Sequence, residues 1–571
     1  MKNSDFTFET IQYVRPDLDA LAAQIDAITA DVTAATSFDA VKALMHRRDD
    51  VMRDAETMVT VAHIRNTLDT RDSFYEDEMA FLDNALPALQ AHMVAYQKAL
   101  VASPFRNDIS REFGPELLTA YGREIAAFNE TLIPYMQEEA ALCTEYQKLI
   151  ASAAIPFDGQ TLNLYGIQKY FEHEDRAVRK EAFRLYSEFF SSHEADMERI
   201  FDRLVEIRTA MGKAAGFSTY TPLGYLLQGR SDYGQEEVAS FRAQVKEVLV
   251  PLCEKLYEAQ AKRIGVDTIM AYDENRVFPD GNAQPIGGVD ELVAQAVKMY
   301  HDISPETGEF IDFMTGHHLM DLANRPGKAA TGYMTELPAY EAPFVFSCFN
   351  GTIGDVGVLS HELGHAFAGY MATRSQPISE YTGCSTDIAE IHSMSMEQFC
   401  YPYAEMYFGD GADKYRFQHL QEAITFVPFG VAVDEFQHVI YENPGLTPKE
   451  RTAVWHDLEL KYMPWRKYDN DPFMERGGYW YHKIHIFLYP MYYINYTLTT
   501  MGAMEFKKRR ETNPEEAWND YLALCKAGGS MSYKNLLRLA NLSIPFEAGS
   551  VERACGYARD ILLHAIQKEQ A

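Results

Sequence analysis

Apolar residues recur every three or four positions over most of this 571-residue chain, and that spacing constrains the fold more than any other feature. The period matches one face of an α-helix and not the alternation of a strand. The first stripe consists of Leu18, Leu21, Ile25, Ile28 and Val32. Similar stripes cover 38–66, 76–103, 115–152, a stretch up to about 213, 234–264, and the chain from 355 onward. The pattern predicts a mainly α protein built from long antiparallel helices.

Two intervals depart from the helical period. Residues 156–168 combine glycine with polar alternation, which predicts a strand segment near residue 160. The interval 266–350 is rich in proline, glycine and asparagine, so we expect short strands and loops there. The chain should therefore contain one small β-sheet and two lobes, an N-terminal helical lobe over 1–190 and a second lobe over 191–571.

Charge and hydropathy limit the classes of partner. The formal net charge of −31 disfavours nucleic acids and anionic membranes, which are bound by clustered lysine and arginine. The first residues, MKNSDFTFETIQYVRPDLDALAA, lack the basic and apolar regions of a secretory signal. No run approaches the roughly 18 consecutive apolar residues of a membrane helix. These features predict a cytoplasmic protein without a nucleic-acid or membrane partner; the oligomeric state is open, and a monomer is compatible with them.

The segment VLSHELGHAFAGY contains His361, Glu362 and His365 in the order His-Glu-x-x-His. On a helix, positions i and i+4 project about 40° apart, so both imidazoles can reach one tetrahedral cation. Glu362 lies about 100° from His361, where its carboxylate can hold a metal-bound water without binding the metal itself. The motif therefore predicts zinc ligands at His361 and His365 and a general base at Glu362.

The alternative for this motif is a surface helix with two solvated histidines and a glutamate. Its apolar neighbours argue against that alternative, because they predict a largely buried helix: Val356, Val358, Leu359, Leu363, Ala366 and Phe367. Buried histidine and glutamate side chains need partners, and a metal ion supplies them. We therefore favour the metal site.

A catalytic zinc site needs a third protein ligand and an open position. The seven cysteines are scattered and form no Cys-x-x-Cys pair, so nitrogen and oxygen ligands are expected. Glu390 is the first candidate, and Glu397, seven residues later on nearly the same helix face, can orient a ligand histidine. Two alternatives stay open: Asp387 and Glu390 form a helix capping box, or Glu380 is the ligand.

A distal segment, GGYWYHKIHIFLYPMYYINYTL, is rich in histidine and tyrosine. On one helix His485, Tyr489, Tyr492 and Tyr496 would share a stripe, with Tyr493 somewhat to the side. Proline 490 should kink that helix. Such a stripe is usually core, but hydroxyls and an imidazole on one face can also donate to an oxyanion.

Taken together, these motifs resemble the thimet oligopeptidase and oligoendopeptidase F family of zinc metallopeptidases, most closely its Pz-peptidase-like bacterial branch. The resemblance rests on PFVFSCFNGTIGDVGVLSHELGHAF, DIAEIHSMSMEQF, GGYWYHKIHIF and YPMYYINY, which extend from about 343 to 497. It implies one Zn²⁺ held by His361, His365 and Glu390, with Glu362 as the base. It also implies contacts of His485, Tyr493 and Tyr496 with the substrate and the transition state.

The family resemblance further implies a two-lobed helical body with a deep substrate channel and a small sheet beside the motif helix. We expect the strand edge that receives the peptide at 342–350. The His-to-Tyr spacing differs by one residue from the thimet branch, which leaves the choice among Tyr489, Tyr492 and Tyr493 open.

The predicted function is zinc-dependent endopeptidase activity on short peptides, in which a water at the zinc gives a proton to Glu362 and attacks the peptide carbonyl. Two other functions are compatible with the motifs. One is a related zinc carboxypeptidase that trims terminal residues. The other is a peptide-binding protein that keeps zinc for structure, although such a site would normally fill all four positions with side chains.

Overall fold

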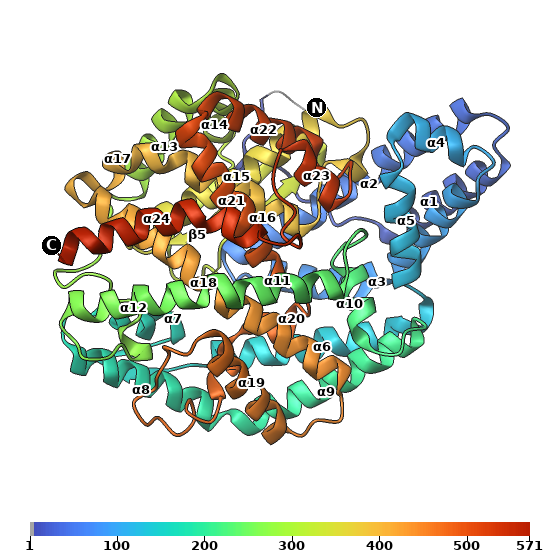
Figure 1. Cartoon of the computed structure of the whole chain (residues 1–571). Helices are drawn as coiled ribbons and strands as arrows, with labels where there is room; N and C mark the ends of the chain where they lie inside the picture. The colour runs from blue at the N-terminus through green and yellow to red at the C-terminus, as the bar shows by residue number, and fades with distance from the viewer. Residues whose placement is uncertain (1–4, 330, 571) are drawn as a thin grey trace.

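Helices make up most of the computed structural model, which describes residues 5–329 and 331–570 (Figure 1). The mainly α fold class is confirmed. Five helices of the N-terminal part, α1 to α5, build a separate hydrophobic cluster and project from the main body at the right of Figure 1. Their bounds are α1 Leu18–Ala34, α2 Phe38–Leu68, α3 Ser73–Ala102, α4 Arg106–Phe113 and α5 Glu116–Ala127. The predicted first stripe is buried throughout α1.

The predicted continuous stripe over 115–152 is wrong, because two helices share it. After α5 ends, α6 begins at Ile133 and runs to Ala151. Between them, the Asn129 side chain accepts from the Thr131 N–H and caps a short 3₁₀ turn, and Pro134 lies in the first turn of α6. Asparagine at a cap and proline in a first turn both favour a new helix start.

The middle of the chain adds helices and the strand elements. The helices are α7 Leu164–Gln168, α8 Arg176–Ser192, α9 Glu194–Ala214, α10 Tyr220–Leu227, α11 Gln235–Val248, α12 Val250–Ile264, α13 Val289–Ile303 and α14 Pro305–Gly316. The expectation of only strands and loops over 266–350 is therefore wrong for α13 and α14. Ser304 caps α14 and Pro305 opens it. The two helices were not predicted because the segments that flank them are rich in glycine and proline.

Two small sheets are present among the described residues. Strands β1 Ile155–Phe157 and β2 Gln160–Leu162 form an antiparallel ribbon, which confirms the segment expected near residue 160. The second sheet has the order β3-β5-β4, with bounds β3 Met320–Ala323, β4 Tyr333–Leu337 and β5 Ala342–Phe349. Since β5 pairs with β3 on one side and β4 on the other, the predicted strand edge at 342–350 is wrong. The two edge strands of this sheet are β3 and β4.

The C-terminal part packs around the motif helix α15. Its helices are α15 Gly354–Ser375, α16 Thr386–Cys400, α17 Ala404–Phe408, α18 Ala412–Glu442, α19 Pro448–Tyr462, α20 Ile484–Leu488, α21 Ile494–Thr512, α22 Pro514–Ala527, α23 Tyr533–Leu539 and α24 Ser550–Gln570. Helix α15 lies against β5 on one side and α16 on the other, and α16 packs along α21. This order places the motif between the sheet and the C-terminal helices.

The predicted single helix with a kink at Pro490 is wrong. Helix α20 ends at Leu488, and α21 starts only at Ile494. Between them, Met491 has a φ of 63°, a left-handed conformation that no helix continues through. The tyrosines of this segment are therefore not displayed on one regular helix face.

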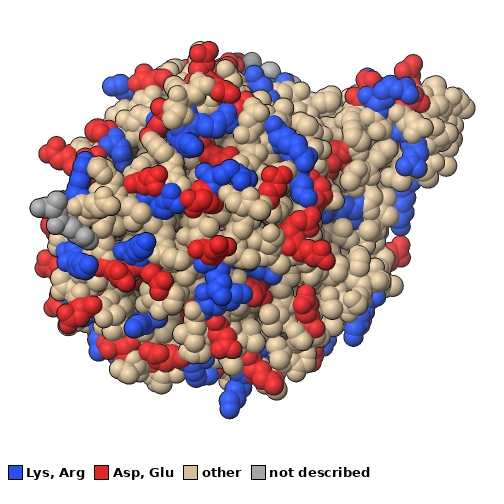
Figure 2. Space-filling model, in the orientation of Figure 1, with Lys and Arg blue, Asp and Glu red and all other residues tan. Residues whose placement is uncertain are grey.

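Surface properties agree with the sequence composition. Figure 2 shows acidic and basic side chains interspersed over the face in view. Within the described ranges, no helix has both the length and the apolar composition that a bilayer span requires. The lobe boundary at residue 190 stays a prediction.

Candidate active site

The turn between β5 and α15 sets the start of the motif helix. The Asp355 carboxylate accepts the backbone N–H groups of Asn350 at 3.0 Å and Gly351 at 2.7 Å. A carboxylate in the first turn of a helix also interacts favourably with the helix dipole. The turn therefore fixes where α15 begins above the sheet and, through the helical period, which way His361 and His365 point.

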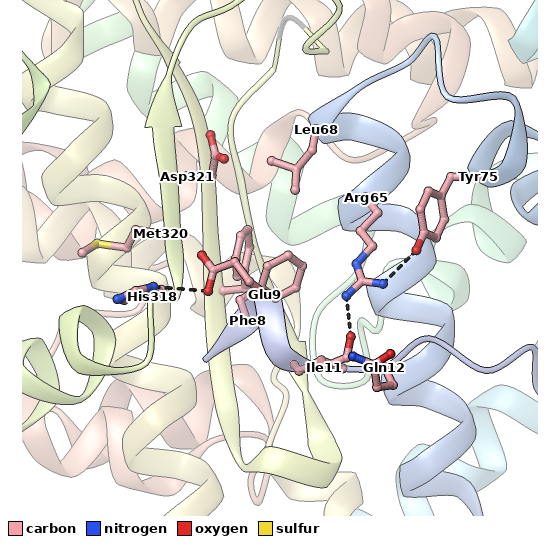
Figure 3. Close-up of a pocket in the computed structure, with 11 residues that line it drawn as sticks. Phe8, Glu9, Ile11, Gln12, Arg65, Leu68, Tyr75, His318, Met320 and Asp321 are labelled. Carbon is pink, nitrogen blue, oxygen red and sulfur yellow. Dashed lines mark hydrogen bonds and ion pairs between the residues drawn. The ribbon is translucent and has the colours of Figure 1, made fainter. Parts of the chain in front are cut away.

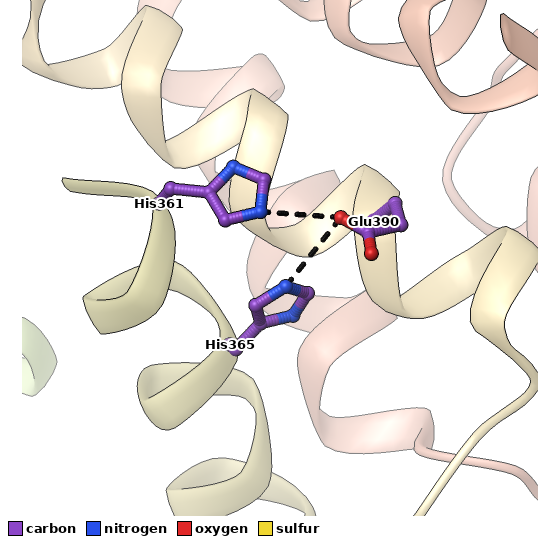
Figure 4. Close-up of side chains that lie close together, drawn as sticks. All are labelled: His361, His365 and Glu390. Carbon is purple, nitrogen blue, oxygen red and sulfur yellow. Dashed lines mark ion pairs between the residues drawn. The ribbon is translucent and has the colours of Figure 1, made fainter. Parts of the chain in front are cut away.

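Three side chains from two helices converge beside α15. His361 and His365 project from α15, and Glu390 projects from the facing helix α16 (Figure 4). Their ligand atoms all lie within 4.8 Å of one another. The Oε2 atom of Glu390 is 3.2 Å from His361 Nε2 and 3.5 Å from His365 Nε2. We call His361, His365 and Glu390 the ligand group.

Gly364 allows α15 and α16 to approach closely enough for this convergence. A Cβ atom at this position would lie 2.8 Å from Met396 Cβ and 2.8 Å from Ser393 Cα, both on α16. Side chains with a Cβ would force the two helices apart. The glycine inside the His-Glu-x-x-His motif thus serves helix packing, a role that the sequence analysis missed.

Glu397 lies behind His361 and holds its ring. Its carboxylate oxygens accept from His361 Nδ1 at 2.6 Å and lie 2.8 Å from His419 Nε2, and the Tyr401 hydroxyl lies 2.6 Å from His419 Nδ1. Burial alone would raise the pKa of Glu397, but the two imidazoles outweigh it and hold the pKa at about 2. An ionised Glu397 keeps the Nδ1 proton on His361 and leaves the lone pair at Nε2.

A divalent cation fits this donor set. With Nδ1 donating to Glu397, Nε2 of a neutral His361 and Oε2 of Glu390, 3.2 Å apart, would both be acceptors, so a proton or a metal ion has to lie between them. Burial lowers the pKa of His361, but Glu390 and Glu397 raise it well above its usual value, so the surroundings favour positive charge here. Two histidines and one glutamate form a known ligand set for catalytic zinc.

The structure separates the candidates for the third ligand. Glu390 lies with the imidazoles, whereas Glu380 pairs with Arg48 and accepts from Tyr121 away from them. The capping-box alternative is wrong, because α16 starts at Thr386 and Asp387 is already inside it. Glu397 occupies the orienting position expected for it. His419 was not expected, since nothing in its own sequence neighbourhood forms a motif.

Glu362 faces a cavity of about 710 Å³ that lies beside His361. Its carboxylate is buried, and a Cβ atom on Gly332 would lie 3.7 Å from its Oε1. Other residues that line this cavity include Ser347, Asn350 and His419. Burial raises the pKa of Glu362, with the two motif imidazoles opposing the shift. A carboxylate with a raised pKa is a better proton acceptor at neutral pH.

The segment between α20 and α21 brings hydroxyls to the ligand group. The Tyr492 hydroxyl donates to Glu390 Oε1 at 3.0 Å, and its ring lies 5.3 Å from that of Tyr496. His485 packs against Tyr496 at 5.9 Å and against Tyr493 at 5.0 Å. Tyr493 is only 3% exposed, whereas Tyr489 is 50% exposed. The sequence did not single out Tyr492 as the partner of Glu390.

His485 is held in its neutral form. Its Nδ1 atom is buried and has no hydrogen-bond partner among the described residues. Burial, assisted by nearby Lys483, lowers the pKa of His485 to about 3. Burial also raises the pKa of Tyr496, so its hydroxyl keeps its proton. Both groups can therefore donate a hydrogen bond at neutral pH.

A second large cavity, of about 490 Å³, lies away from the ligand group, between the N-terminal segment, α2 and β3 (Figure 3). Its polar groups already have partners. Arg65 donates to the Tyr75 hydroxyl, and His318 lies 3.2 Å from Glu9. Asp321 accepts from Arg325 and from Lys328. We assign this cavity no catalytic chemistry.

Comparison with known proteins identifies the family of this chain. The model of Peptidase family M3 matches residues 169–555, and that of the Peptidase M3 N-terminal domain matches residues 8–128. The chain is 21% identical over 550 residues to Oligopeptidase PepF of Bacillus subtilis (strain 168), covering 91% of this chain and 80% of that protein.

Solved structures share the whole fold. A structure of Pz peptidase A with an inhibitor has a TM-score of 0.94 and 42% identity, covering 98% of this chain and 99% of that one. A structure described as an oligoendopeptidase F from Bacillus anthracis str. Ames has a TM-score of 0.91 and 37% identity, covering 100% of both chains. The resemblance inferred from the motifs is confirmed. The chain therefore belongs to peptidase family M3, and its reaction class is peptide hydrolysis.

Proposed function

We propose that this protein is a zinc-dependent endopeptidase that cleaves short peptides. The observation that carries the proposal is the convergence of His361, His365 and Glu390 beside the buried carboxylate of Glu362. Zinc would be held by the ligand group, with one position left for solvent or substrate. The proposal includes a cytoplasmic location and a catalytic lobe over 191–571.

The chemistry divides among the chain's own residues. A bound zinc ion would act as a Lewis acid toward water and the peptide carbonyl. Glu362 accepts a proton as a water oxygen bonds to the carbonyl carbon, and it returns that proton to the amide nitrogen as the C–N bond breaks. Glu397 keeps His361 oriented through its Nδ1 hydrogen bond.

Stabilisation of the tetrahedral oxyanion is assigned to Tyr496 and His485, both partly exposed and both proton donors at neutral pH. Tyr493 packs against the ring of His485, and its burial favours a role in holding that ring. The direct substrate contact expected for Tyr493 stays a prediction. Tyr492 donates to Glu390 and would fix the rotamer of that ligand.

An extended peptide would lie beside the free edge of β4. Gly332, directly before this strand, lines the cavity with Glu362. Met334 and Glu336 of the strand line a second cavity beside His365. Main-chain hydrogen bonds to a strand edge recognise a peptide with little dependence on its side chains. This placement of the peptide supports cleavage at internal bonds of short peptides.

The test uses Glu362→Gln, which keeps the size of the side chain and removes its basicity. We expect full zinc content by metal analysis and a loss of at least about 10²-fold in cleavage of a quenched fluorescent peptide. Substantial residual turnover by a zinc-loaded variant would reject Glu362 as the base. A peptide blocked at both ends separates this proposal from a carboxypeptidase, because only an endopeptidase cuts it. Failure of chelators to stop hydrolysis would contradict the role of zinc.

A further inference from the structure

A smaller cavity of about 240 Å³ lies beside His365, whereas the cavity that contains Glu362 lies beside His361. Small and apolar residues form most of its wall, and Glu336, His365 and His392 also line it together with the thiols of Cys384 and Cys525. The catalytic steps assigned above use neither Glu336 nor His392. The cavity adjoins the ligand group, so a substrate side chain could enter it during cleavage.

Glu336 lies on β4 and points toward α15. Its Oε1 would be 2.5 Å from a Cβ atom at position 369, so Gly369 makes room for the carboxylate. Gly369 follows His365 by four residues, which is about 6 Å along a helix axis. The carboxylate of Glu336 therefore lies roughly one helical turn from a proposed zinc ligand.

Glu336 has no counter-charge within the described ranges. No hydrogen bond or ion pair to its carboxylate is present there, and the charged group that acts on it is another acid, Glu56. Burial and Glu56 together raise the pKa of Glu336 to about 7. A partly buried carboxyl group without a partner is costly, and a donor from a ligand would relieve that cost.

His392 also lines this cavity, but its Nε2 atom is buried in the protein. Its side chain is 2% exposed, and its Nε2 has no hydrogen-bond partner among the residues that the structure describes. The carboxylate of Glu336 is therefore the group in this cavity that a ligand with several N–H donors would satisfy.

We propose that this cavity receives a lysine or arginine side chain of the substrate peptide, with Glu336 as the residue that selects for it. The ammonium or guanidinium group supplies several N–H donors, and its carbon stem suits a wall of methionine, alanine and glycine. The net charge of −31 also favours the approach of cationic peptides. This inference rests on the proposed peptidase function and names its substrate class.

The direction of β4 predicts where the basic residue stands. Glu336 lies near the C-terminal end of β4, and Gly332 precedes its N-terminal end. A peptide that pairs antiparallel with the free edge of β4 therefore puts its N-terminal residues beside Glu336. Cleavage should occur on the carboxyl side of the lysine or arginine.

The experiment uses quenched peptides that are identical except for one residue, which is lysine, arginine, norleucine or glutamate. For the zinc-loaded wild type we expect kcat/KM at least about tenfold higher with lysine or arginine than with norleucine, and lowest with glutamate. Mass spectrometry of the products should find the cut after the basic residue. Equal rates, or a preference for norleucine, would overturn the proposal.

Glu336→Gln tests the assignment to this carboxylate. The ratio of lysine to norleucine cleavage should fall to near one in this variant. In Glu56→Gln, which removes the neighbouring charge that opposes ionisation of Glu336, the ratio should stay at or above the wild-type value. Glu336→Asp retains the charge on a shorter stem and should give an intermediate ratio, which guards against a folding defect of the glutamine variant. An unchanged ratio in Glu336→Gln would reject the role of Glu336.

Peptide binding separates this inference from the proposed function. Anisotropy titration of the labelled lysine and norleucine peptides with the zinc-loaded Glu362→Gln protein should show at least about tenfold tighter binding of the lysine peptide. If the wild type cleaves no peptide but this binding preference holds, the peptidase proposal fails and the basic subsite stands. If peptides are cleaved without a preference in either assay, the subsite proposal fails and the peptidase stands.

Discussion

The ligand group and the tyrosine segment of the site, residues 485–496, differ in the backbone that carries their side chains. His361, His365 and Glu390 project from two unbroken helices, α15 and α16. Tyr492 lies instead in the break between α20 and α21, and His485 lies in the short helix α20 just before that break. The ligand group is placed by helix geometry and one close helix contact. The tyrosine segment is placed by side chains from elsewhere in the chain.

Long-range hydrogen bonds hold the interrupted backbone. Arg230 donates to the Met491 carbonyl at 2.6 Å, and the side-chain oxygen of Gln437 accepts the Met491 N–H at 2.8 Å. Arg208 donates to the Phe487 carbonyl. Backbone groups that a continuous helix would satisfy internally are thus satisfied by α9, α18 and the loop after α10. We therefore expect substitutions in the ligand group to weaken metal binding, and substitutions in the tyrosine segment to lower turnover.

The largest effect should follow loss of a ligand. Glu390→Gln should weaken zinc binding more than about 100-fold, since removing only an outer partner of a ligand already costs 10–100-fold. Zinc titration against a chelator measures the affinity. Glu380→Gln is the matched control, because Glu380 pairs with Arg48 away from the imidazoles, and it should keep zinc. Equal zinc loss in both variants would contradict the assignment of the third ligand.

An effect on turnover alone, with zinc binding unchanged, is expected at the tyrosine segment. Tyr496→Phe should lower kcat by about 10²- to 10³-fold, because one oxyanion donor is lost, while zinc content stays complete. Tyr489→Phe, at the 50% exposed neighbour, should turn over at nearly the wild-type rate. Steady-state kinetics on metal-loaded protein provide the measurement. A loss of zinc in Tyr496→Phe would show that the two groups are not separable.

Substitution of two glycines of α15 tests whether the close contact between α15 and α16 is needed. Gly364→Ala should destabilise the protein by about 1–3 kcal/mol and lower zinc affinity, because its Cβ would meet α16 at 2.8 Å. Gly357→Ala introduces a Cβ that meets nothing within 4 Å, and should be neutral or stabilise by up to about 1 kcal/mol. Thermal melting of the two variants gives the comparison. A stable, fully active Gly364→Ala would mean that the close contact is not needed.

The smallest effect is expected for substitution of Pro490, which lies in the break between α20 and α21. Pro490→Ala should cost no more than about 1 kcal/mol and leave kcat within a few-fold of wild type, since Arg230 and Gln437 still hold Met491. Melting temperature and kcat are the readouts. A loss as large as that of Tyr496→Phe would show that the proline itself, and not the surrounding side chains, determines the placement of the tyrosines.

Much of the fold was accessible from apolar spacing. The stripe of α1 and the motif helix α15 appeared where the period placed them, because amphipathic helices reflect local sequence. Helices α13 and α14 were missed where glycine and proline at their flanks dominated the composition. The central position of β5 was also missed, since strand order depends on partners distant in sequence.

For the site, the sequence by itself determined that His361 and His365 share one helix face with Glu362 beside them, because a helix repeats every 3.6 residues wherever it forms. Only the tertiary structure decided that Glu390 and not Glu380 meets the imidazoles, that His419 supports Glu397, and that Tyr492 reaches Glu390. Those contacts join segments far apart in the chain. They depend on how closely two helices pack and on which partners the buried backbone groups find. The local spacing of apolar residues specifies neither of these.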